Sequence, residues 1–554
     1  MAALPCLQVW ITTPRDRSQE GLSLLRVASR LPLLAVLAAL WACTSATPAP
    51  TPTATPTAGP EIPAAVVLAS PVPPPHLDVH QEVAESLISL GPGISYSRLL
   101  RIRSGPGADP AILEVECDLC IEWDILDPLT YLFRLRPDVL WHDLPPVNGR
   151  PLTAADVVFS LDRLRTPGWP GASLLQAIAS VEATDQTTVT VRLSYPDADL
   201  LLALANGQSK IVAPEAVAQA GDLRDGPTIG TGPWVLDEMG PDGARFSANP
   251  AYYEPGLPGL ERLTIVPIPD ASNRLAALLT GLADITIVDP EDWDRLLSSP
   301  APVQGVVFPQ PGTGLLLGLN VTRPPFNRLD VRQALFQSLD PWQALDTMWQ
   351  GHGQVGLGLP APSSDWPLAL DDMRTYLGNS DVARSLLAKA GLELPLAFTL
   401  TVADFGPRHL ALAGEYQRML EQTGFQATLN PVNPRVYAEE VWDARDFDAF
   451  LGPMPPVHTP NAFLFGLLHS QGRWSPTGYS DAELDSLIET QAIAREGRSV
   501  LIRQLQTRVL EQAVLFTPIT GTSLWAWQDR IEGFQPAFGA SEYLHWARLT
   551  LRNE

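Results

Sequence analysis

Two cysteines separated by two residues, Cys117 and Cys120, have the spacing in this sequence that could most directly do chemistry. A CxxC pair can form a local disulfide, remain as two small buried thiols, hold a metal ion or take part in thiol–disulfide exchange. A zinc knuckle needs two further ligands at knuckle spacing, and none lies nearby in the sequence. A redox motif needs a helix N-terminus after its first cysteine, whereas this segment is typical of a strand leading to Trp123. We predict a disulfide if the chain is exported, with unpaired thiols, and then metal or redox chemistry, as the alternatives.

The other candidate chemical groups form no motif. The eight histidines are scattered, and His76 and His80, four residues apart, follow Pro74 and Pro75, which disfavours a metal-binding helix face. There is no HExxH, no GxSxG and no P-loop sequence, and an adjacent acidic pair such as Asp371–Asp372 is common. We therefore predict no catalytic residue, no metal and no cofactor, and hence not an enzyme.

The first 43 residues have the pattern of an export signal. Four arginines precede an apolar run from Leu31 to Trp41, which is short for a membrane span. The run ends at Ala42-Cys43, similar to a bacterial lipobox, in which the cysteine becomes the acylated N-terminus. Trp41 stands where a small residue is usual, so a buried helix ending in an inert cysteine stays open as the alternative. We predict a signal peptide over 1–43 and a lipid anchor at Cys43.

A stretch rich in proline, threonine and alanine follows over 44–75. Proline fixes φ and removes backbone donors, so such a segment cannot build a core and favours an extended chain. Directly after a lipidation-like cysteine, it is interpreted as a disordered tether that holds a folded body away from a membrane.

Length and charge limit the remaining possibilities. At 554 residues the chain is too long for one ordinary core, so two or three lobes are expected. The formal net charge of −24 argues against a nucleic-acid backbone or an anionic bilayer as a partner.

The segment from Tyr131 to Arg165 predicts the local elements most clearly. Residues 131–136 alternate apolar and polar side chains, as a half-buried strand does. A loop rich in proline follows, and then Thr153 and Asp156 have the spacing of a helix capping box. A second alternating run over 188–193 predicts another strand. Strand, loop and helix in this order fit an α/β protein.

The same segment resembles the family 5 extracellular solute-binding proteins of ABC importers. The positions that carry the resemblance are Tyr131, Phe133, Leu135, Arg136, Pro137, Trp141, Leu152, Thr153, Ala154, Asp156, Val157 and Phe159. Further matches follow in order, at the Gly-Thr-Gly-Pro segment of 229–236, at 246–253, at 317–335 and at 381–391. The resemblance extends from about Tyr96 to about Phe538.

This resemblance implies an α/β, periplasmic-binding-protein-like fold of the class II type, with three lobes and a hinged ligand cleft. By family position, lobe I comprises 76–105, 226–321 and 515–554. Lobe II comprises 106–225 and lobe III comprises 322–514.

The resemblance also nominates ligand-binding residues. Tyr96 and Asn320 correspond to the early cleft segment and to the hinge, although a core tyrosine and an Asx turn are the alternatives. In peptide-binding members an aromatic residue and a carboxylate that holds the peptide ammonium follow the strand near 450. Here Pro453 and Pro456 stand at those positions, and the neighbouring Met454 and His458 become candidates. A buried ammonium without a carboxylate partner is costly, so the departure favours a hydrophobic ligand without a free amino group.

We therefore expect a monomeric, extracytoplasmic solute-binding lipoprotein, tethered to the cell membrane, that delivers a peptide or other small solute to the permease subunits of an ABC importer. An exported hydrolase, or a solute sensor or scaffold without transport, is the alternative.

Overall fold

The computed structural model describes residues 65–105, 107–108, 112–362, 364–455, 459–536 and 544–552, which belong to one compact unit, Ile62–Glu554. Cys43, His458 and the predicted signal peptide lie outside these residues, as does most of the predicted tether. Within them, no helix combines the length and the apolar character needed to cross a membrane. The described residues also contain no group of three His, Cys, Asp or Glu side chains that could hold a metal ion.

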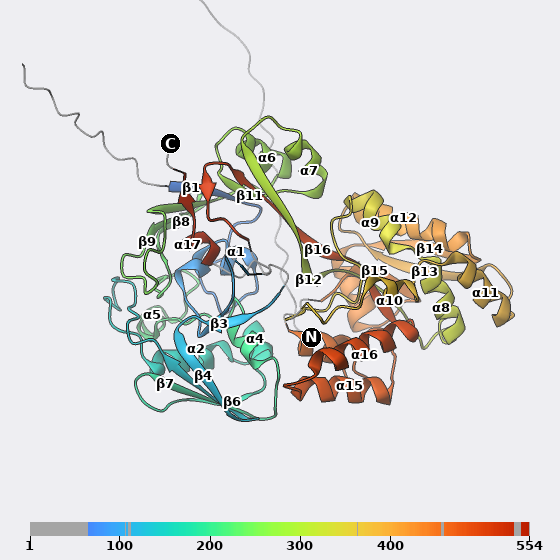
Figure 1. Ribbon diagram of the computed structural model, residues 1–554, viewed down its shortest axis with the longest axis horizontal. Coiled ribbons are helices and arrows are strands. Elements are labelled where there is room, and N and C mark those ends of the chain that lie inside the picture. The colour runs from blue at the N-terminus through green and yellow to red at the C-terminus, as the bar shows by residue number, and fades with distance from the viewer. Residues whose placement is uncertain are drawn as a thin grey trace, which may run out of the picture. The chain divides into compact units, whose positions relative to one another are not determined.

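A large mixed sheet of ten strands organises the described part of the chain (Figure 1). In spatial order it contains β14 (Phe425–Val432), β13 (Leu396–Ala403), β15 (Ala449–Pro453), β12 (Val303–Leu319), β16 (Leu515–Gln528), β11 (Ile285–Ile287), β1 (Ala65–Ser70), β10 (Arg262–Pro267), β9 (Gly243–Ala248) and β8 (Trp234–Gly240).

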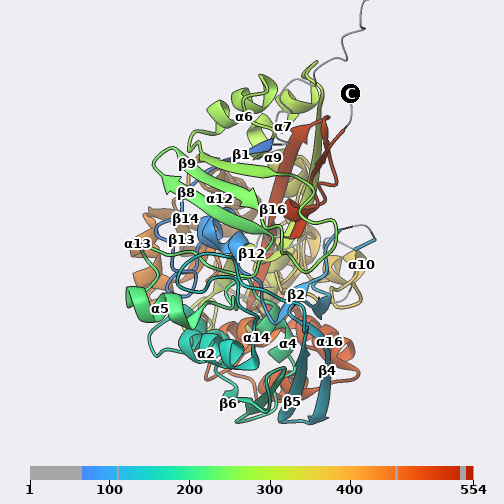
Figure 2. The same ribbon diagram turned by 90° about the vertical axis from the view of Figure 1, so that its left-hand side faces the viewer.

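The long antiparallel strands β12 and β16 connect the two ends of this sheet. Residues 315–319 of β12 pair with β15 on one side, and 515–519 of β16 pair with β12 on its other side, whereas 525–527 of β16 pair with β11. The register between them shifts from Gln310 to Gly314, and both Gly312 and Gly314 have positive φ. Figure 2 shows β16 in red, extending along the molecule beside β12. The irregularity therefore lies in the strands that join the two ends of the sheet.

A smaller antiparallel sheet carries the predicted motif. Within the described residues it contains β4 (Cys120–Asp127), β5 (Thr130–Leu135), β7 (Thr188–Leu193) and β6 (Ile178–Ala183), in that order. Tyr131, Phe133 and Leu135 are buried while Arg134 is exposed, so the predicted alternation is confirmed. Helix α2 (Ala154–Leu164) starts at the predicted capping box, where the Asp156 carboxylate accepts a hydrogen bond from the Thr153 backbone N–H at 2.9 Å.

The remaining elements are short helices and two strand pairs. The helices include α1 (Glu85–Ile88), α3 (Pro170–Leu174), α4 (Leu200–Ala205), α5 (Pro214–Ala220), α6 (Ala271–Leu279), α7 (Pro290–Leu297), α8 (Leu329–Ser338), α9 (Pro341–Trp349), α10 (Leu370–Arg374), α11 (Ser380–Ala390), α12 (Pro407–Glu421), α13 (Pro434–Tyr437), α14 (Pro460–Leu468), α15 (Ala482–Ile493), α16 (Arg498–Glu511) and α17 (Leu544–Ala547). The strand pairs are β2 (Leu100–Ile102) with β3 (Val115–Cys117), and β17 (Ile531–Glu532) with β18 (Thr550–Leu551).

One predicted boundary is wrong. The tether was predicted to extend over 44–75, but Ala65–Ser70 form strand β1, which lies between β10 and β11 as a parallel neighbour of both. Val66 and Leu68 are fully buried in the sheet. The segment Ala-Val-Val-Leu-Ala has the composition of a buried parallel strand, and the prolines on either side of it obscured this signal.

Candidate functional site

A cavity of about 200 Å³ lies against the segment between α9 and α10. Four described lining residues come from elsewhere. Met373 lies in α10, Ile112 precedes β3, Gln506 lies in α16 and Thr520 lies in β16. Engineered cavities of about 150 Å³ already admit benzene, so this volume suffices for a small organic group. The described lining residues are Ile112, Gln354, Val355, Gly356, Leu357, Gly358, Leu359, Ala361, Ser364, Trp366, Pro367, Leu368, Met373, Gln506 and Thr520.

Backbone hydrogen bonds fix this segment against the two long strands. Gly356 and Thr517 exchange both of their N–H···O bonds, at 3.0 and 2.6 Å. The N–H of Thr520 donates to the carbonyl of Gln354 at 2.9 Å, and that of Gly312 donates to the carbonyl of Gly358 at 2.7 Å. The cavity wall is therefore attached to β12 and β16 next to the register shift.

Helix α16 supports the wall from the other side. The Gln506 side-chain amide donates to the carbonyl of Trp366 at 2.7 Å, and Trp366 is 5% exposed. The Arg498 guanidinium, at the first turn of the same helix, lies 4.9 Å from the centre of the Trp366 ring. The position of this tryptophan thus depends on two side chains of α16.

The described part of the lining has no ionisable group. None of its described residues carries a carboxylate, an imidazole, an amine, a guanidinium or a thiol. Glutamine, serine and threonine side chains supply its side-chain hydrogen-bonding groups, and the rest is glycine or apolar. Because burying an unpaired charge is costly, such a surface favours an uncharged and mainly apolar group.

Met454 is the predicted site residue that lies beside this cavity. A Cβ atom added to Gly358, which has a φ of +73°, would lie 2.7 Å from Met454 Cε and 2.6 Å from Thr517 Oγ1. Met454 follows β15, and its N–H donates to the carbonyl of Gly314 at 3.2 Å. The Thr517 hydroxyl is buried and has no hydrogen-bond partner among the described residues.

The other predicted site residues lie elsewhere. Tyr96 is fully buried in the hydrophobic cluster around the smaller sheet, and burial raises the pKa of its hydroxyl. The Asn320 oxygen accepts from the N–H and hydroxyl of Thr322, which is an Asx turn, and its amide donates to the carbonyls of Arg445 and Phe447. Neither residue belongs to the described cavity lining. His458 lies outside the described residues.

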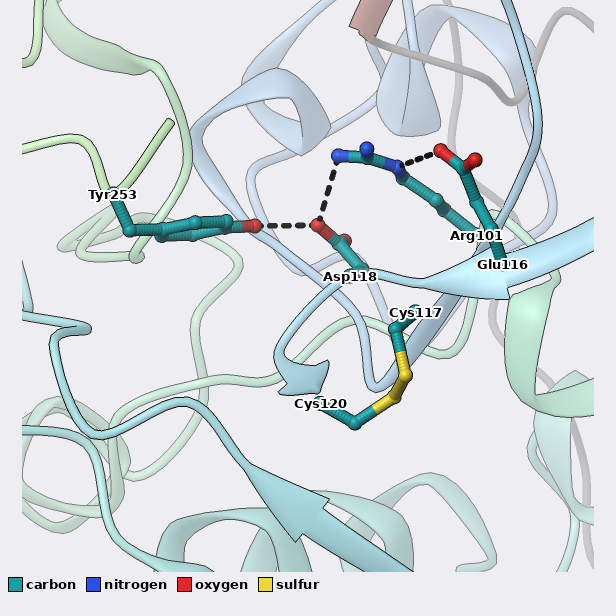
Figure 3. Close-up of a disulfide and its surroundings, with 6 residues drawn as sticks. All are labelled: Arg101, Glu116, Cys117, Asp118, Cys120 and Tyr253. Carbon is teal, nitrogen blue, oxygen red and sulfur yellow. Dashed lines mark hydrogen bonds and ion pairs between the residues drawn. A yellow bond between two sulfur atoms is a disulfide. The ribbon is translucent and has the colours of Figure 1, made fainter. Parts of the chain in front are cut away.

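Cys117 and Cys120 form a disulfide in the structure, with their Cα atoms 5.1 Å apart. Figure 3 shows it beside a buried polar cluster, in which Asp118 faces the Tyr253 hydroxyl and Arg101. The Tyr253 hydroxyl donates to Asp118, and the Arg101 guanidinium lies 3.5 Å from the same carboxylate. This cluster contributes no residue to the described lining of the cavity.

Sequence reasoning missed Trp366, Gln506 and Arg498. A signal for the first was available, because Trp366 lies in a segment of 357–367 rich in glycine, proline and serine between two helices, as functional loops often do. The two side chains of α16 carry no such local signal, since their role depends on what the helix packs against.

Comparison with known proteins assigns the family. Residues 114–475 match the sequence model for "Bacterial extracellular solute-binding proteins, family 5 Middle". The chain belongs to this family. The resemblance and the α/β, periplasmic-binding-protein-like fold predicted from the sequence are therefore confirmed.

Named relatives of this family 5 protein differ in ligand. It is similar to heme-binding protein A of Haemophilus influenzae, with 26% identity over 80% of this chain and 85% of the relative. It is also similar to the probable di/tripeptide-binding protein 5 of Pseudomonas aeruginosa, with 27% identity over 87% of this chain and 95% of the relative.

Among solved structures, the fold matches that of the ABC transporter substrate-binding protein CtaP from Listeria monocytogenes. The TM-score is 0.76 with 19% identity, over 88% of this chain and 99% of that one. These family 5 proteins are binding proteins of ABC importers, not enzymes.

Proposed function

We propose that this chain is the extracytoplasmic solute-binding component of an ABC importer and that it captures a small, uncharged and mainly apolar solute. It works as a monomer, anchored to the membrane through acylated Cys43, which becomes the N-terminus when the residues before it are removed. The segment between Cys43 and β1 acts as the tether, which keeps the receptor at a high effective concentration near its permease.

The observation that carries the proposal is the composition and origin of the cavity. Its described lining has no ionisable side chain. In the proposed three-lobe division, Thr520 comes from lobe I (76–105, 226–321 and 515–554), Ile112 from lobe II (106–225) and Gln506 from lobe III (322–514). A site shared by three lobes is emptied when they separate and enclosed when they meet, which is how a hinged receptor captures and releases solute.

The proposed ligand class follows from the lack of charged side chains in the described cavity lining. A zwitterionic dipeptide would bury its ammonium against a described lining that supplies no carboxylate. The relatives named for heme and for di/tripeptides indicate that this family accommodates different solutes on one fold. An uncharged solute can form hydrogen bonds with the glutamine and hydroxyl groups of the lining, and its desolvation costs little free energy.

The first test is native mass spectrometry of the protein purified from its own host, followed by thermal-shift measurements with defined probes. The probes are Leu-Leu, N-acetyl-Leu-Leu-amide and indole. The capped peptide or indole should raise the melting temperature, and any solute should be recovered unaltered. Tight binding of free Leu-Leu, or turnover of a bound compound, would contradict the proposal.

A filled cavity provides the second test. The A361L substitution adds volume to the lining and should abolish the thermal shift, whereas A444L changes an exposed alanine outside the cavity and should leave the shift intact. Equal binding by A361L and the unmodified protein would exclude this cavity as the site.

A further inference from the structure

A polar cluster joins the segment before α4 to the helices α14, α15 and α16. The two Asp199 carboxylate oxygens accept hydrogen bonds from the Arg498 guanidinium and from the backbone N–H of Asn461, each at 2.5 Å. The Asn461 side-chain amide donates to Asp197 at 2.6 Å. Beside these contacts, the backbone N–H of Ala198 donates to the carbonyl of Ala492 at 2.8 Å.

The charges in this cluster are both buried and satisfied. The side chains of Asp199 and Arg498 are 2% and 10% exposed. Arg498 also donates to the Asn461 side-chain oxygen at 2.8 Å and to the Gln491 oxygen at 3.0 Å. Asn461 lies in the first turn of α14, where the helix dipole further favours the Asp199 carboxylate.

The same guanidinium reaches the cavity wall. Arg498 stacks on Trp366, whose carbonyl is held by Gln506 eight residues further along α16. One rigid helix therefore links the wall of the cavity to the contact with Asp199. A change in the position of Trp366 would therefore move the Arg498 guanidinium relative to the Asp199 carboxylate.

We infer that Arg498 is a positioning residue that holds the closed arrangement of the cavity by pairing with Asp199 while it stacks on Trp366. The inference rests on the proposed function, in which Asp199 belongs to lobe II and Arg498 to lobe III. When the lobes separate, water hydrates both charges; when they meet, each charge loses its water and gains its partner. We call the contacts of Arg498 with Asp199 and Trp366 the clamp. Because desolvation offsets most of the attraction of a buried ion pair, the clamp specifies one placement of the lobes without making closure permanent.

A cross-linking experiment tests the clamp without any solute. Cysteines introduced as A198C and A492C should form a disulfide only when the two segments meet, because their backbones are hydrogen-bonded to each other. The rate of linkage under mild oxidation, measured by mass spectrometry of the joined peptides, then reports how often the full-length protein is closed.

In this background D199N and R498Q should each slow linkage by about tenfold or more, because each leaves a buried hydrogen-bonded charge without its counterion. W366L should also slow linkage, while W366F, which keeps an aromatic face for the guanidinium, should restore most of the rate. R503Q is the matched control, since Arg503 lies on the same helix and also contacts the cavity segment, but through Asp365 instead of through Trp366. It should link at the unmodified rate.

Unchanged linkage in D199N or R498Q, or equal slowing in R503Q, would overturn the inference. Thermal melting of each variant shows whether it has folded, and R498K, which keeps the charge but loses the planar group, replaces R498Q if that variant melts early. Failure of all three solute probes together with slowed linkage in D199N would reject the proposed ligand class and support the clamp.

Discussion

Two buried arginine–aspartate pairs in this protein have similar burial but different connectivity. Asp118 is fully buried beside Arg101, and it also accepts the N–H of Arg98, twenty residues away in sequence, at 2.8 Å. Asp199 is almost as buried beside Arg498, which is 299 residues away. The first pair joins strands β2 and β3 with the turn between β3 and β4, whereas the second joins parts of the chain that have separate hydrophobic clusters.

The difference shows when a buried charge pair can be used as a switch. Breaking the Asp118 contacts requires local unfolding, because strand pairing and the disulfide hold their elements together. In our proposal, breaking the Asp199 contacts requires only that two folded lobes separate, and water then hydrates both groups. The same chemistry therefore stabilises the fold in one place and, in our proposal, reports closure in the other.

The largest expected effect is the loss of the first pair. D118A removes the acceptor of Tyr253 and of the Arg98 N–H and should lower the free energy of unfolding by about 3 kcal/mol. D199A should lower it by less than about 1 kcal/mol, because its partner becomes hydrated when the lobes open. Urea denaturation of both variants measures this contrast, and equal losses would remove the distinction between the two pairs.

A smaller loss is expected at the register shift that links the two ends of the large sheet. Gly314 has a φ of +112°, and an added Cβ would lie 2.3 Å from the carbonyl oxygen of Ile519. G314A should therefore cost about 2 kcal/mol of stability and slow the A198C–A492C linkage, because the strands β12 and β16 must shift. G240A, where an added Cβ meets nothing within 4 Å, is the control. Faster linkage in G314A would show that the irregularity opposes closure.

Removal of the disulfide should affect the region around Asp118 and leave the contacts of Asp199 unchanged. The double variant C117S/C120S frees a short loop and should cost about 2 kcal/mol in thermal or urea unfolding, by the loss of a constraint on the unfolded chain. Linkage of A198C with A492C should not change. A slowed linkage would mean that the disulfide region and the clamp are coupled.

The smallest expected effect is a loss of stability at acidic pH. Burial lowers the pKa of His142 to about 4, and its Nδ1 accepts the N–H of Gly230 at 3.3 Å while its Nε2 faces the carbonyl of Gly232 at 3.1 Å. The unfolded chain thus binds more protons between pH 6.5 and 4, so this stability is complete above pH 6.5 and declines as the pH falls towards 4. Unfolding at pH 5 should be easier than at pH 7 by about 1–2 kcal/mol for this histidine.

The H142Q variant should show a flatter dependence of unfolding free energy on pH than the unmodified protein. Some dependence should remain, because burial also lowers the pKa of His80 to about 4. An unaltered slope in H142Q would show that this side chain is protonated without cost in the folded protein.

Much of the local structure was predictable because it depends on neighbouring residues. The alternation of 131–136 and 188–193 predicted β5 and β7, and the spacing of Thr153 and Asp156 predicted the start of α2. The segment that contains β5 and the start of α2 also carried the family resemblance. The match of residues 114–475 to the family model confirms that resemblance. Strand period, capping and turn chemistry need no partner from elsewhere in the chain.

The tertiary structure decided which side chains meet. Tyr96 is an aromatic side chain beside glycine-rich turns, but only packing places it in the core rather than at the cavity. Strand β1 depends on parallel partners far along the chain, and the cavity depends on Ile112, Gln506 and Thr520 reaching one place. Contacts between distant segments follow from how whole elements pack, and no short pattern in the sequence encodes them.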